Sequence, residues 1–542
     1  MNHRLPMMTG AAAGVALTAV ESLRPSLTPR STVHQGLVTG MMTVTGAAVG
    51  AVTGKIAAAT GLPGSRHVLP VVGLTGVGAF TASRFREHVL WGQVAHPDWE
   101  QPSGDLAKGA ALAVAGTTAA ATAFLGASHG LARLGRGISK HAPGPAPFWT
   151  AACLAAIGAA AAGAGTVGLR RVKSELTTAG KAADAALADP PPDPFVSGGP
   201  GSLLNYDTLS REGRRYVRWR VNKSDLEAAG HVAPSEPVRV FVGIDSAPSI
   251  EQQVDLATAE LDRLDAWDRQ VLIAVSPAGS GYANSVPVEA LEYFVNGSCA
   301  SVVVQYGVLP SMFSTDKVPA ATQTFRLLID RIHDRIMERP QGSRPKFLIY
   351  GESLGARAAE LALLQEPALV DLTTASVAKV DAALFVGTPG GPSLRDLLLH
   401  HPATVHVDRW QALPDLIPDH VQLWFLEHDA DPVTRFSAEL VARKPDWLAT
   451  EPPGRNVPPQ MRWLPLLTWQ QVLFDVAYAT QAQSGVFRSV GHDYRADLGQ
   501  VVATAFAPES KSQTEHVQML LAQREVARDA KLVATQASDE GS

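Results

Sequence analysis

The stretch that decides the fold runs from Arg344 to Leu364 and reads RPKFLIYGESLGARAAELALL. A short apolar run, Phe347–Tyr350, is followed by Gly351-Glu-Ser-Leu-Gly355 and then by an Ala/Leu/Glu segment with helical spacing. A strand, Gly-x-Ser-x-Gly and a helix in this order are typical of a nucleophile elbow, the sharp turn that presents a reactive serine. The pattern therefore predicts that Ser353 is a nucleophile on the turn after a strand.

The residue types at this turn fit the chemistry of a serine nucleophile. The hydroxyl must project above the sheet from a strained backbone, so the flanking positions need glycines, which add no Cβ to the crowded junction. The helix that follows begins with backbone N–H groups and a positive dipole end, which stabilise a developing oxyanion. We therefore expect the backbone N–H of Leu354 to be an oxyanion donor.

A second Gly-x-Ser-x-Gly, Gly126-Ala-Ser-His-Gly130, provides an internal comparison. It closes an Ala-rich apolar run, with no strand predicted before it and no helix predicted after it. Context rather than the bare pattern identifies an elbow, so Ser353 is the predicted nucleophile and Ser128 is not.

The composition sets broad limits on structure and function. A chain of 542 residues suggests two to four domains, and a net charge of −5 gives no reason to expect nucleic acid. Two cysteines, Cys153 and Cys299, are too few for a disulfide framework and are interpreted as buried thiols. No His/Asp/Cys cluster has metal-ligand spacing and no P-loop is present, so we expect neither a metal nor another cofactor.

The first 180 residues contain long uncharged runs of small and apolar residues, some of which approach the roughly 20 residues that cross a bilayer. Small residues at four-residue spacing, Gly46, Gly50 and Gly54, let helices pack closely in lipid. We therefore expect residues 1–180 to form an all-α transmembrane domain of about four to five spans. A soluble Ala-rich helical domain is the alternative. The candidate spans are Met7–Val20, Gly36–Gly54, Val68–Ser83, Gly109–Leu131 and Phe148–Leu169.

These spans predict a multi-pass protein of the cell membrane. If the N-terminus faces out, the inner loops carry slightly more Lys and Arg than the outer ones. This asymmetry favours a cytoplasmic catalytic domain by a narrow margin.

A Pro- and Gly-rich segment, residues 181–203, is predicted to be the linker to a catalytic domain at 204–508. In that domain short apolar strands alternate with helical stretches, which predicts an α/β fold with a mostly parallel sheet and helices on both faces. Residues 509–542 are predicted to be a polar tail with one helix, at Thr514–Val533. The predicted strands are Val238–Ile244, Gln270–Ser276, Ser301–Tyr306, Phe347–Tyr350, Asp381–Val386 and Val421–Glu427.

An elbow serine needs a histidine base and a carboxylate that orients it, and in this fold the chain order is Ser, Asp/Glu, His. Asp431 follows the strand Val421–Glu427 and directly precedes a Pro-Val pair, so it is the predicted acid, with Asp429 as the alternative. His492 is preceded by a glycine and lies just before a helical stretch. It is the predicted base, and His516 in the polar tail is the alternative.

A second oxyanion donor normally comes from the loop after the third strand of this fold. Here that loop is Ser276–Ala283, rich in small residues whose backbone N–H groups can face a substrate oxygen. Ala278 and Gly279 are the candidate donors, although an ordinary strand-to-helix turn would have the same composition.

Six short stretches occur in an order that is more specific than any one of them: Arg24–Arg30, Gly213–Val217, Val242–Ser246, Tyr350–Gly355, His428–Val433 and Gly491–Tyr494. In these the chain resembles the actinobacterial membrane-associated α/β-hydrolases, in which a multi-span N-terminal region precedes the catalytic domain. The resemblance implies an α/β-hydrolase fold and, by motif, a triad of Ser353, Asp431 and His492. It supplies no substrate. The third-strand loop of that family tends to be Thr-rich, unlike the loop here.

The leading hypothesis is a membrane-anchored serine hydrolase that cleaves an ester, thioester or lipid-derived substrate through an acyl-enzyme. An acyltransferase that uses the same acyl-enzyme is the second hypothesis, and a non-catalytic membrane scaffold or binding protein is the third. A complete Ser/Asp/His set in the expected order favours an enzyme. The expected partners are an acyl or lipid-like small molecule and the membrane; the oligomeric state stays open.

Overall fold

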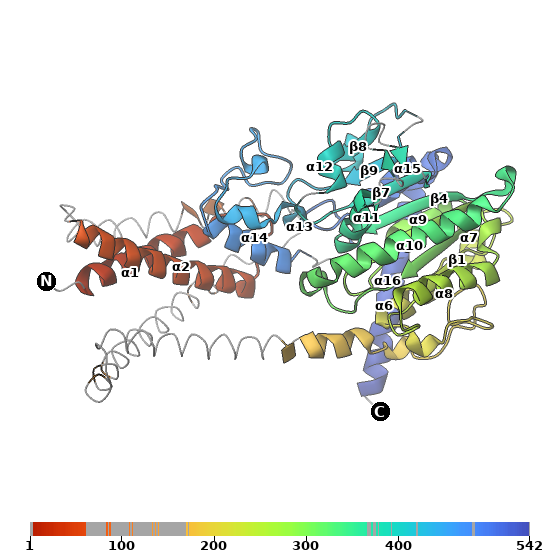
Figure 1. The fold of residues 1–542 in the computed structure, drawn as a ribbon, viewed down its shortest axis with the longest axis horizontal. Helices are drawn as coiled ribbons and strands as arrows, with labels where there is room; N and C mark the ends of the chain where they lie inside the picture. Colours follow the sequence, from red (N-terminus) through yellow and green to blue (C-terminus); the bar gives the residue numbers. More distant parts are fainter. Residues whose placement is uncertain are drawn as a thin grey trace. The chain divides into compact units, whose positions relative to one another are not determined.

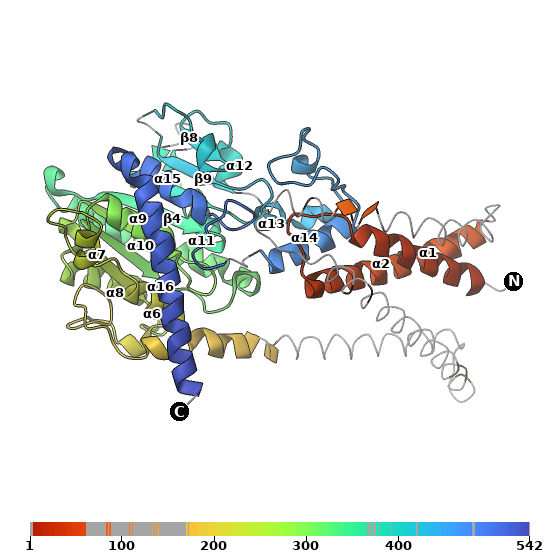
Figure 2. The same cartoon turned by 180° about the vertical axis from the view of Figure 1, so that it is seen from behind.

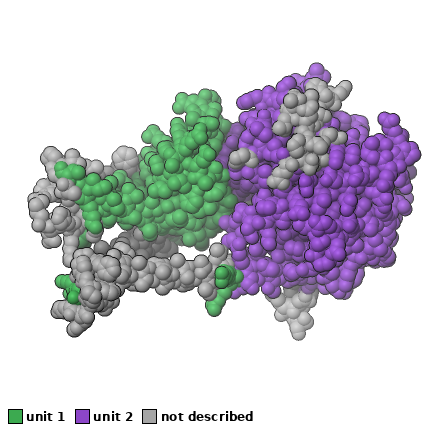
Figure 3. All heavy atoms as spheres, viewed as in Figure 1, with its two compact units in different colours: residues 1–172, 436–478 green, residues 173–435, 479–542 purple. Residues whose placement is uncertain are grey.

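The computed structural model describes residues 4–60 and 170–540, apart from position 172 and short gaps at 366–369, 372–375, 378, 392, 419–420 and 480–482; isolated positions between 83 and 139 are also described. The chain divides into two compact units (Figure 3). Unit 1 comprises residues 1–172 and 436–478, and unit 2 comprises residues 173–435 and 479–542.

Unit 2 is built on a parallel sheet, in which seven strands are described in the order β1-β3-β2-β4-β7-β9-β8. A separate antiparallel pair, β5 (Val370–Asp371) and β6 (Ser376–Val377), stands apart from it. The prediction of an α/β domain with a mostly parallel sheet is confirmed. The seven strands are β1 (Val238–Val242), β2 (Val271–Ser276), β3 (Cys299–Val304), β4 (Lys346–Glu352), β7 (Ala382–Val386), β8 (Thr404–Val407) and β9 (Leu423–Leu426).

Helices cover both faces of this sheet, as Figures 1 and 2 show from opposite sides. Successive strand residues point to opposite faces, so Phe347 and Ile349 join one core while Leu348 and Tyr350 join the other. The first core is closed by α8 (Ile250–Arg263), α10 (Val318–Met337) and α11 (Leu354–Gln365). The second is closed by α6 (Arg211–Arg218), α9 (Ser285–Phe294), α15 (Arg495–Phe506) and α16 (Thr514–Glu540).

The two ends of unit 2 differ from the boundaries expected from the sequence. The segment 181–203 is held against the unit: Asp184 pairs with Arg215 at 2.7 Å, and the backbone N–H of Ser197 donates to the carbonyl oxygen of Arg239. At the other end, the expected polar tail is largely α16, whose Val517 is buried in the second core. Unit 2 therefore starts near residue 173 and includes the C-terminal helix.

In unit 1, helices α1 (Arg4–Ser22) and α2 (Thr32–Ala59) form a hairpin, drawn in red in Figure 1. Glycines let the backbones approach closely. A Cβ placed on Gly14 would lie 1.9 Å from the carbonyl oxygen of Gly46, and one on Gly10 would lie 2.1 Å from that of Gly50. The predicted close helix approach at Gly46 and Gly50 is therefore present between α1 and α2.

Among the described helices, one, over Thr32–Ala57, is long and apolar enough to cross a membrane. The predicted spans Val68–Ser83, Gly109–Leu131 and Phe148–Leu169 lie outside the described residues, apart from isolated positions, and Ser128 and Cys153 lie outside them as well. The transmembrane domain of about four to five spans therefore stays a prediction.

Unit 1 also contains residues 436–478, which sequence reasoning assigned to the catalytic domain. In it, α14 (Leu467–Ala477) packs on α2. Further contacts join this segment to the hairpin. Arg24 donates to the carbonyl oxygen of Gln460 at 2.8 Å, and Gln470 donates to Thr45 at 2.6 Å.

The carboxylate of Asp475 on α14 is the centre of a buried polar cluster. It accepts hydrogen bonds from the backbone N–H of Leu27 and the hydroxyl of Thr28, each at 3.0 Å. His34 Nε2 lies 3.3 Å and Arg30 Nε 3.8 Å from Asp475 Oδ1, and all three side chains are fully buried. Burial alone would raise the pKa of Asp475, but the neighbouring His34 imidazole and the charge of Arg30 outweigh burial and hold that pKa below its usual value.

Candidate active site

Ser353 stands between β4, which ends at Glu352, and α11, which begins at Leu354. Its φ is +55°, in the left-handed region that non-glycine residues rarely adopt, and its backbone N–H donates to the carbonyl oxygen of Val386 at 2.9 Å. Such a conformation costs on the order of 1–3 kcal/mol and persists where the surrounding structure enforces it. The segment thus has the strand–turn–helix form expected of an elbow.

The two glycines of the motif are required by close backbone approach. A Cβ placed on Gly351 would lie 2.8 Å from the Cα of Ala356, inside the elbow itself. One placed on Gly355 would lie 2.1 Å from the carbonyl oxygen of Ser276, at the end of β2. Any larger residue at either position would push the serine out of place, and the second contact brings the loop after β2 against the start of α11.

His492 and Asp431 are hydrogen-bonded, with 2.7 Å between His492 Nδ1 and Asp431 Oδ2. Asp431 is fully buried, and its other oxygen, Oδ1, accepts from the backbone N–H of Val433 at 2.8 Å. The alternative acid, Asp429, instead pairs with Arg435 at 3.1 Å. The alternative base, His516, is exposed on α16. The geometry therefore brings together Asp431 and His492 among the candidates.

The Ser353 backbone and the His492 ring both lie beside the carboxyl end of β7 (Ala382–Val386). Ser353 is hydrogen-bonded to the carbonyl oxygen of Val386, the last residue of that strand. The next residue, Gly387, has a φ of +57°, and a Cβ placed on it would lie 2.9 Å from His492 Cε1. Two consecutive residues at this strand end thus hold the Ser353 backbone and lie beside the His492 ring, and the absence of a Cβ at Gly387 makes room for the imidazole.

The carboxylates around His492 favour the protonated form of its imidazole more than water does. Burial alone would lower the pKa of His492, but the neighbouring carboxylates, Asp431 first and then Glu352 and Asp493, outweigh burial and raise the pKa above its ordinary value. Glu352 directly precedes the serine and accepts hydrogen bonds from Asn284 at 2.8 Å and from Tyr350. A second carboxylate therefore acts on the site electrostatically, and sequence reasoning did not single it out.

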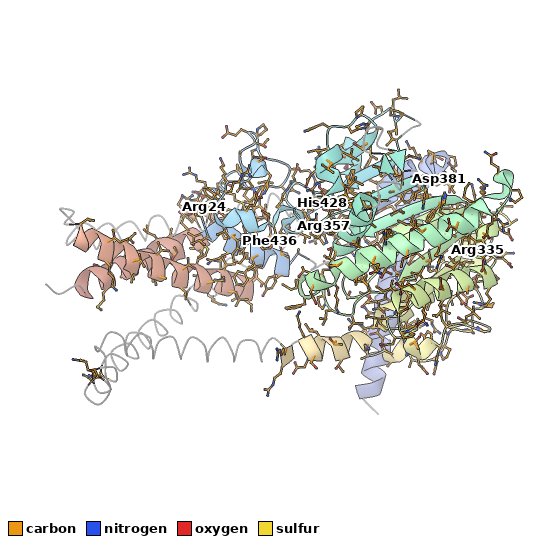
Figure 4. The ribbon with its side chains drawn as sticks, in the orientation of Figure 1. Arg24, Arg335, Arg357, Asp381, His428 and Phe436 are labelled. Carbon is orange, nitrogen blue, oxygen red and sulfur yellow. The ribbon has the colours of Figure 1, made fainter. Side chains whose placement is uncertain are left out.

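Two further residues that sequence reasoning missed hold the acid and base loops together. The hydroxyl of Tyr494 donates to Asp431 Oδ2 at 2.6 Å. His428, labelled in Figure 4, stacks on the Tyr494 ring with 4.0 Å between centroids. Its Nδ1 lies 2.8 Å from the carbonyl oxygen of Gly491, and its Nε2 lies 2.9 Å from Asp497. Both residues belong to stretches quoted for the family resemblance, but no local pattern indicated their contacts.

The predicted oxyanion donors differ in whether their backbone N–H groups already have a hydrogen-bond partner. Leu354 is the first residue of α11, where backbone N–H groups lack partners within the helix. The N–H of Ala278, however, donates to the carbonyl oxygen of Tyr282 at 2.8 Å, and that of Gly279 donates to the hydroxyl of Ser311 at 3.4 Å. The loop after β2 therefore lies against the start of α11, and the N–H groups of Ala278 and Gly279 are hydrogen-bonded to the protein.

Within the described residues no group of three or more His, Cys, Asp or Glu side chains could hold a metal ion, and Cys299 is a buried free thiol.

Comparison with known proteins shows the family to which the chain belongs. Residues 238–405 and 418–519 match the model of the Alpha/beta-hydrolase family, and residues 23–219 match the model of the Alpha/beta-hydrolase family N-terminus. No match was found among curated proteins or among solved structures. The two matched regions contain Ser353, Asp431 and His492 as well as the hairpin from residue 23 onward.

Proposed function

Because the chain belongs to the alpha/beta-hydrolase family, we propose that it is a serine hydrolase acting on ester-type bonds, with Ser353 as the nucleophile. The observation that carries this proposal is the 2.7 Å hydrogen bond between His492 and Asp431, at the same strand end as a serine held at positive φ. The serine, the aspartate and the histidine come from three separate loops of unit 2.

In the proposed reaction the Ser353 hydroxyl attacks the carbonyl carbon of the substrate while His492 Nε2 accepts the hydroxyl proton. Asp431 holds the proton on Nδ1, which leaves Nε2 as the accepting nitrogen, and the Tyr494 hydroxyl fixes Asp431 in turn. The protonated imidazole then donates to the leaving group, an acyl-enzyme forms, and water hydrolyses it by the same steps. The N-terminus of α11 stabilises the oxyanion through the N–H of Leu354.

We further propose that the protein is anchored to the membrane and that its substrate carries an apolar acyl chain. The support for the membrane anchor comes from α2, the one described helix that is long and apolar enough to cross a membrane. Six of its large apolar side chains are between 46 % and 64 % exposed, which is unfavourable in water but not in lipid. They are Val33, Leu37, Val44, Val49, Val52 and Ile56.

Labelling with a fluorophosphonate probe tests the nucleophile. The full-length protein in detergent should be labelled, Ser353→Ala should abolish labelling, and Ser128→Ala, in the other Gly-x-Ser-x-Gly, should leave it unchanged. Labelling that survives Ser353→Ala would overturn the proposal.

A further inference from the structure

The hydroxyl of Tyr306 is a buried donor without a hydrogen-bond partner among the described residues. The residue is 7 % exposed and lies two positions beyond the end of β3. Leaving a hydroxyl buried and unpaired costs about 1–3 kcal/mol, and most buried polar atoms in native proteins are paired. An unpaired donor at this position therefore needs an explanation.

The position of Tyr306 relative to the elbow suggests one. In a parallel sheet all strands end at the same edge, so the residues after β3 and after β4 lie along one edge. The Tyr306 side chain packs with Leu354 and Ala358 of α11 and with Ala321 of α10. Leu354 directly follows the serine, so this cluster includes the first turn of the elbow helix.

The loop after β2 is held by the residues on either side of Tyr306. Gln305 Nε2 donates to the carbonyl oxygen of Ser280 at 3.1 Å. A Cβ placed on Gly307 would lie 2.5 Å from the carbonyl oxygen of Gly279. This loop was expected to supply the second oxyanion donor, but the N–H groups of Ala278 and Gly279 already have protein partners. The expected backbone donors are thus occupied, whereas the Tyr306 hydroxyl, on the segment that holds this loop, has no partner among the described residues.

We propose that the Tyr306 hydroxyl donates a hydrogen bond to the carbonyl oxygen of the acyl substrate and so acts as the second oxyanion donor beside the N–H of Leu354. This inference rests on the proposed function. When Ser353 Oγ bonds to the carbonyl carbon, the C=O π electrons move onto the oxygen, and the phenol stabilises that charge without transferring its proton. When the C=O bond re-forms, the leaving group departs with the proton held by His492.

The surroundings of the phenol suit this role. Burial raises the pKa of Tyr306 above the ordinary value of 10, so the hydroxyl keeps its proton and remains a donor at physiological pH. Its neighbours Leu354, Ala358, Ala321 and Val318 are apolar and offer no competing acceptor side chain. They suit a substrate whose acyl group is apolar and whose polar atom at this point is the carbonyl oxygen.

The test compares Tyr306→Phe with Tyr216→Phe in the full-length protein, assayed with a p-nitrophenyl ester and by thermal unfolding. Phenylalanine keeps the ring and its packing and removes the hydroxyl alone. For Tyr306→Phe we expect kcat to fall by about 10² to 10³-fold, the loss typical of one oxyanion donor, with little change in KM. The midpoint of unfolding should be unchanged or higher, because an unpaired buried hydroxyl is removed.

Tyr216 is the matched control, since its hydroxyl is also buried in unit 2 but donates to Ser301 at 2.7 Å. Tyr216→Phe should lower the midpoint and leave kcat unchanged. Wild-type kcat in Tyr306→Phe would overturn the inference, and so would a loss of kcat that accompanies a fall in the midpoint like that of the control. In either case loss of all activity in Ser353→Ala would leave the proposed hydrolase function standing, whereas activity that survives Ser353→Ala would overturn both.

Discussion

Asp431 Oδ2 lies 2.7 Å from His492 Nδ1 and 2.6 Å from the hydroxyl of Tyr494. Tyr494 follows His492 by two positions on the same loop. One carboxylate oxygen is therefore shared between the imidazole that it orients and a phenol that fixes it in place. Asp429, two positions earlier, is engaged by Arg435 instead. The contrast between these two aspartates leads to the first prediction.

Asp431→Asn should lower kcat for a p-nitrophenyl ester by about 10³ to 10⁴-fold, because the imidazole loses the group that selects its tautomer and stabilises its charge. Asp429→Asn should keep kcat close to that of the wild type, since this carboxylate pairs with Arg435 and not with His492. A large loss in Asp429→Asn together with normal turnover in Asp431→Asn would show that the acid is the other aspartate.

Activity should depend on pH through His492. The imidazole acts as a base only when neutral, and its pKa is raised above 6.5, so kcat/KM should fall as the pH drops through a value above 6.5. Removing a carboxylate that raises this pKa must lower it, so Glu352→Gln should move the acidic limb of the pH–rate profile to lower pH. Glu338→Gln, at an exposed carboxylate paired with Arg335, should leave the limb in place. A limb that stays put or moves to higher pH in Glu352→Gln would contradict this electrostatic account.

Asp475→Ala should destabilise unit 1 by about 3–5 kcal/mol, the usual effect of removing one partner of a buried ion pair. The change leaves Arg30 without its carboxylate and the backbone N–H of Leu27 without its acceptor. Thermal unfolding in detergent measures the effect. Glu439→Gln is the control from the same segment, because its pair with Arg443 is 72 % exposed on both sides and should matter little. Equal midpoints for the two variants would show that the cluster does not hold the segment.

A truncated chain that begins at Lys173, the first residue of unit 2, should aggregate or lose most of its probe reactivity. Residues 436–478 belong to the same compact unit as the hairpin, and without it α14 would expose the face that packs on α2 and the carboxylate of Asp475. Gel filtration and fluorophosphonate labelling of the truncated chain provide the measurement. A monodisperse and fully reactive product would show that the segment does not depend on the hairpin.

The elbow could be predicted because its signal is local. A strand, two glycines around a serine and a helix follow each other within about 20 residues, and each has its own physical requirement. Most strands of unit 2 were predicted within a few residues for the same reason, since their side chains are buried on both faces and read as apolar runs. The edge strand β8 was missed, because His406 and Thr404 interrupt its short apolar pattern.

The features that escaped prediction depend on contacts between distant parts of the chain. Nothing near Asp475 indicates that its partners are Arg30 and His34, more than 400 positions earlier. His428 contacts the loop of His492 in the same non-local way. The small residues of the loop after β2 led to the prediction that its backbone N–H groups are available to a substrate. Only the folded loop shows that the N–H groups of Ala278 and Gly279 already donate hydrogen bonds to the protein.

The most direct measurement of the central claim is the mass of the full-length protein after reaction with a fluorophosphonate, followed by peptide mapping of the adduct. The account predicts one adduct per chain, on the peptide that contains Ser353, and formation that slows strongly in Asp431→Asn because the histidine base is no longer oriented. An adduct on a peptide without Ser353, or no adduct under conditions that preserve the fold, would contradict the account.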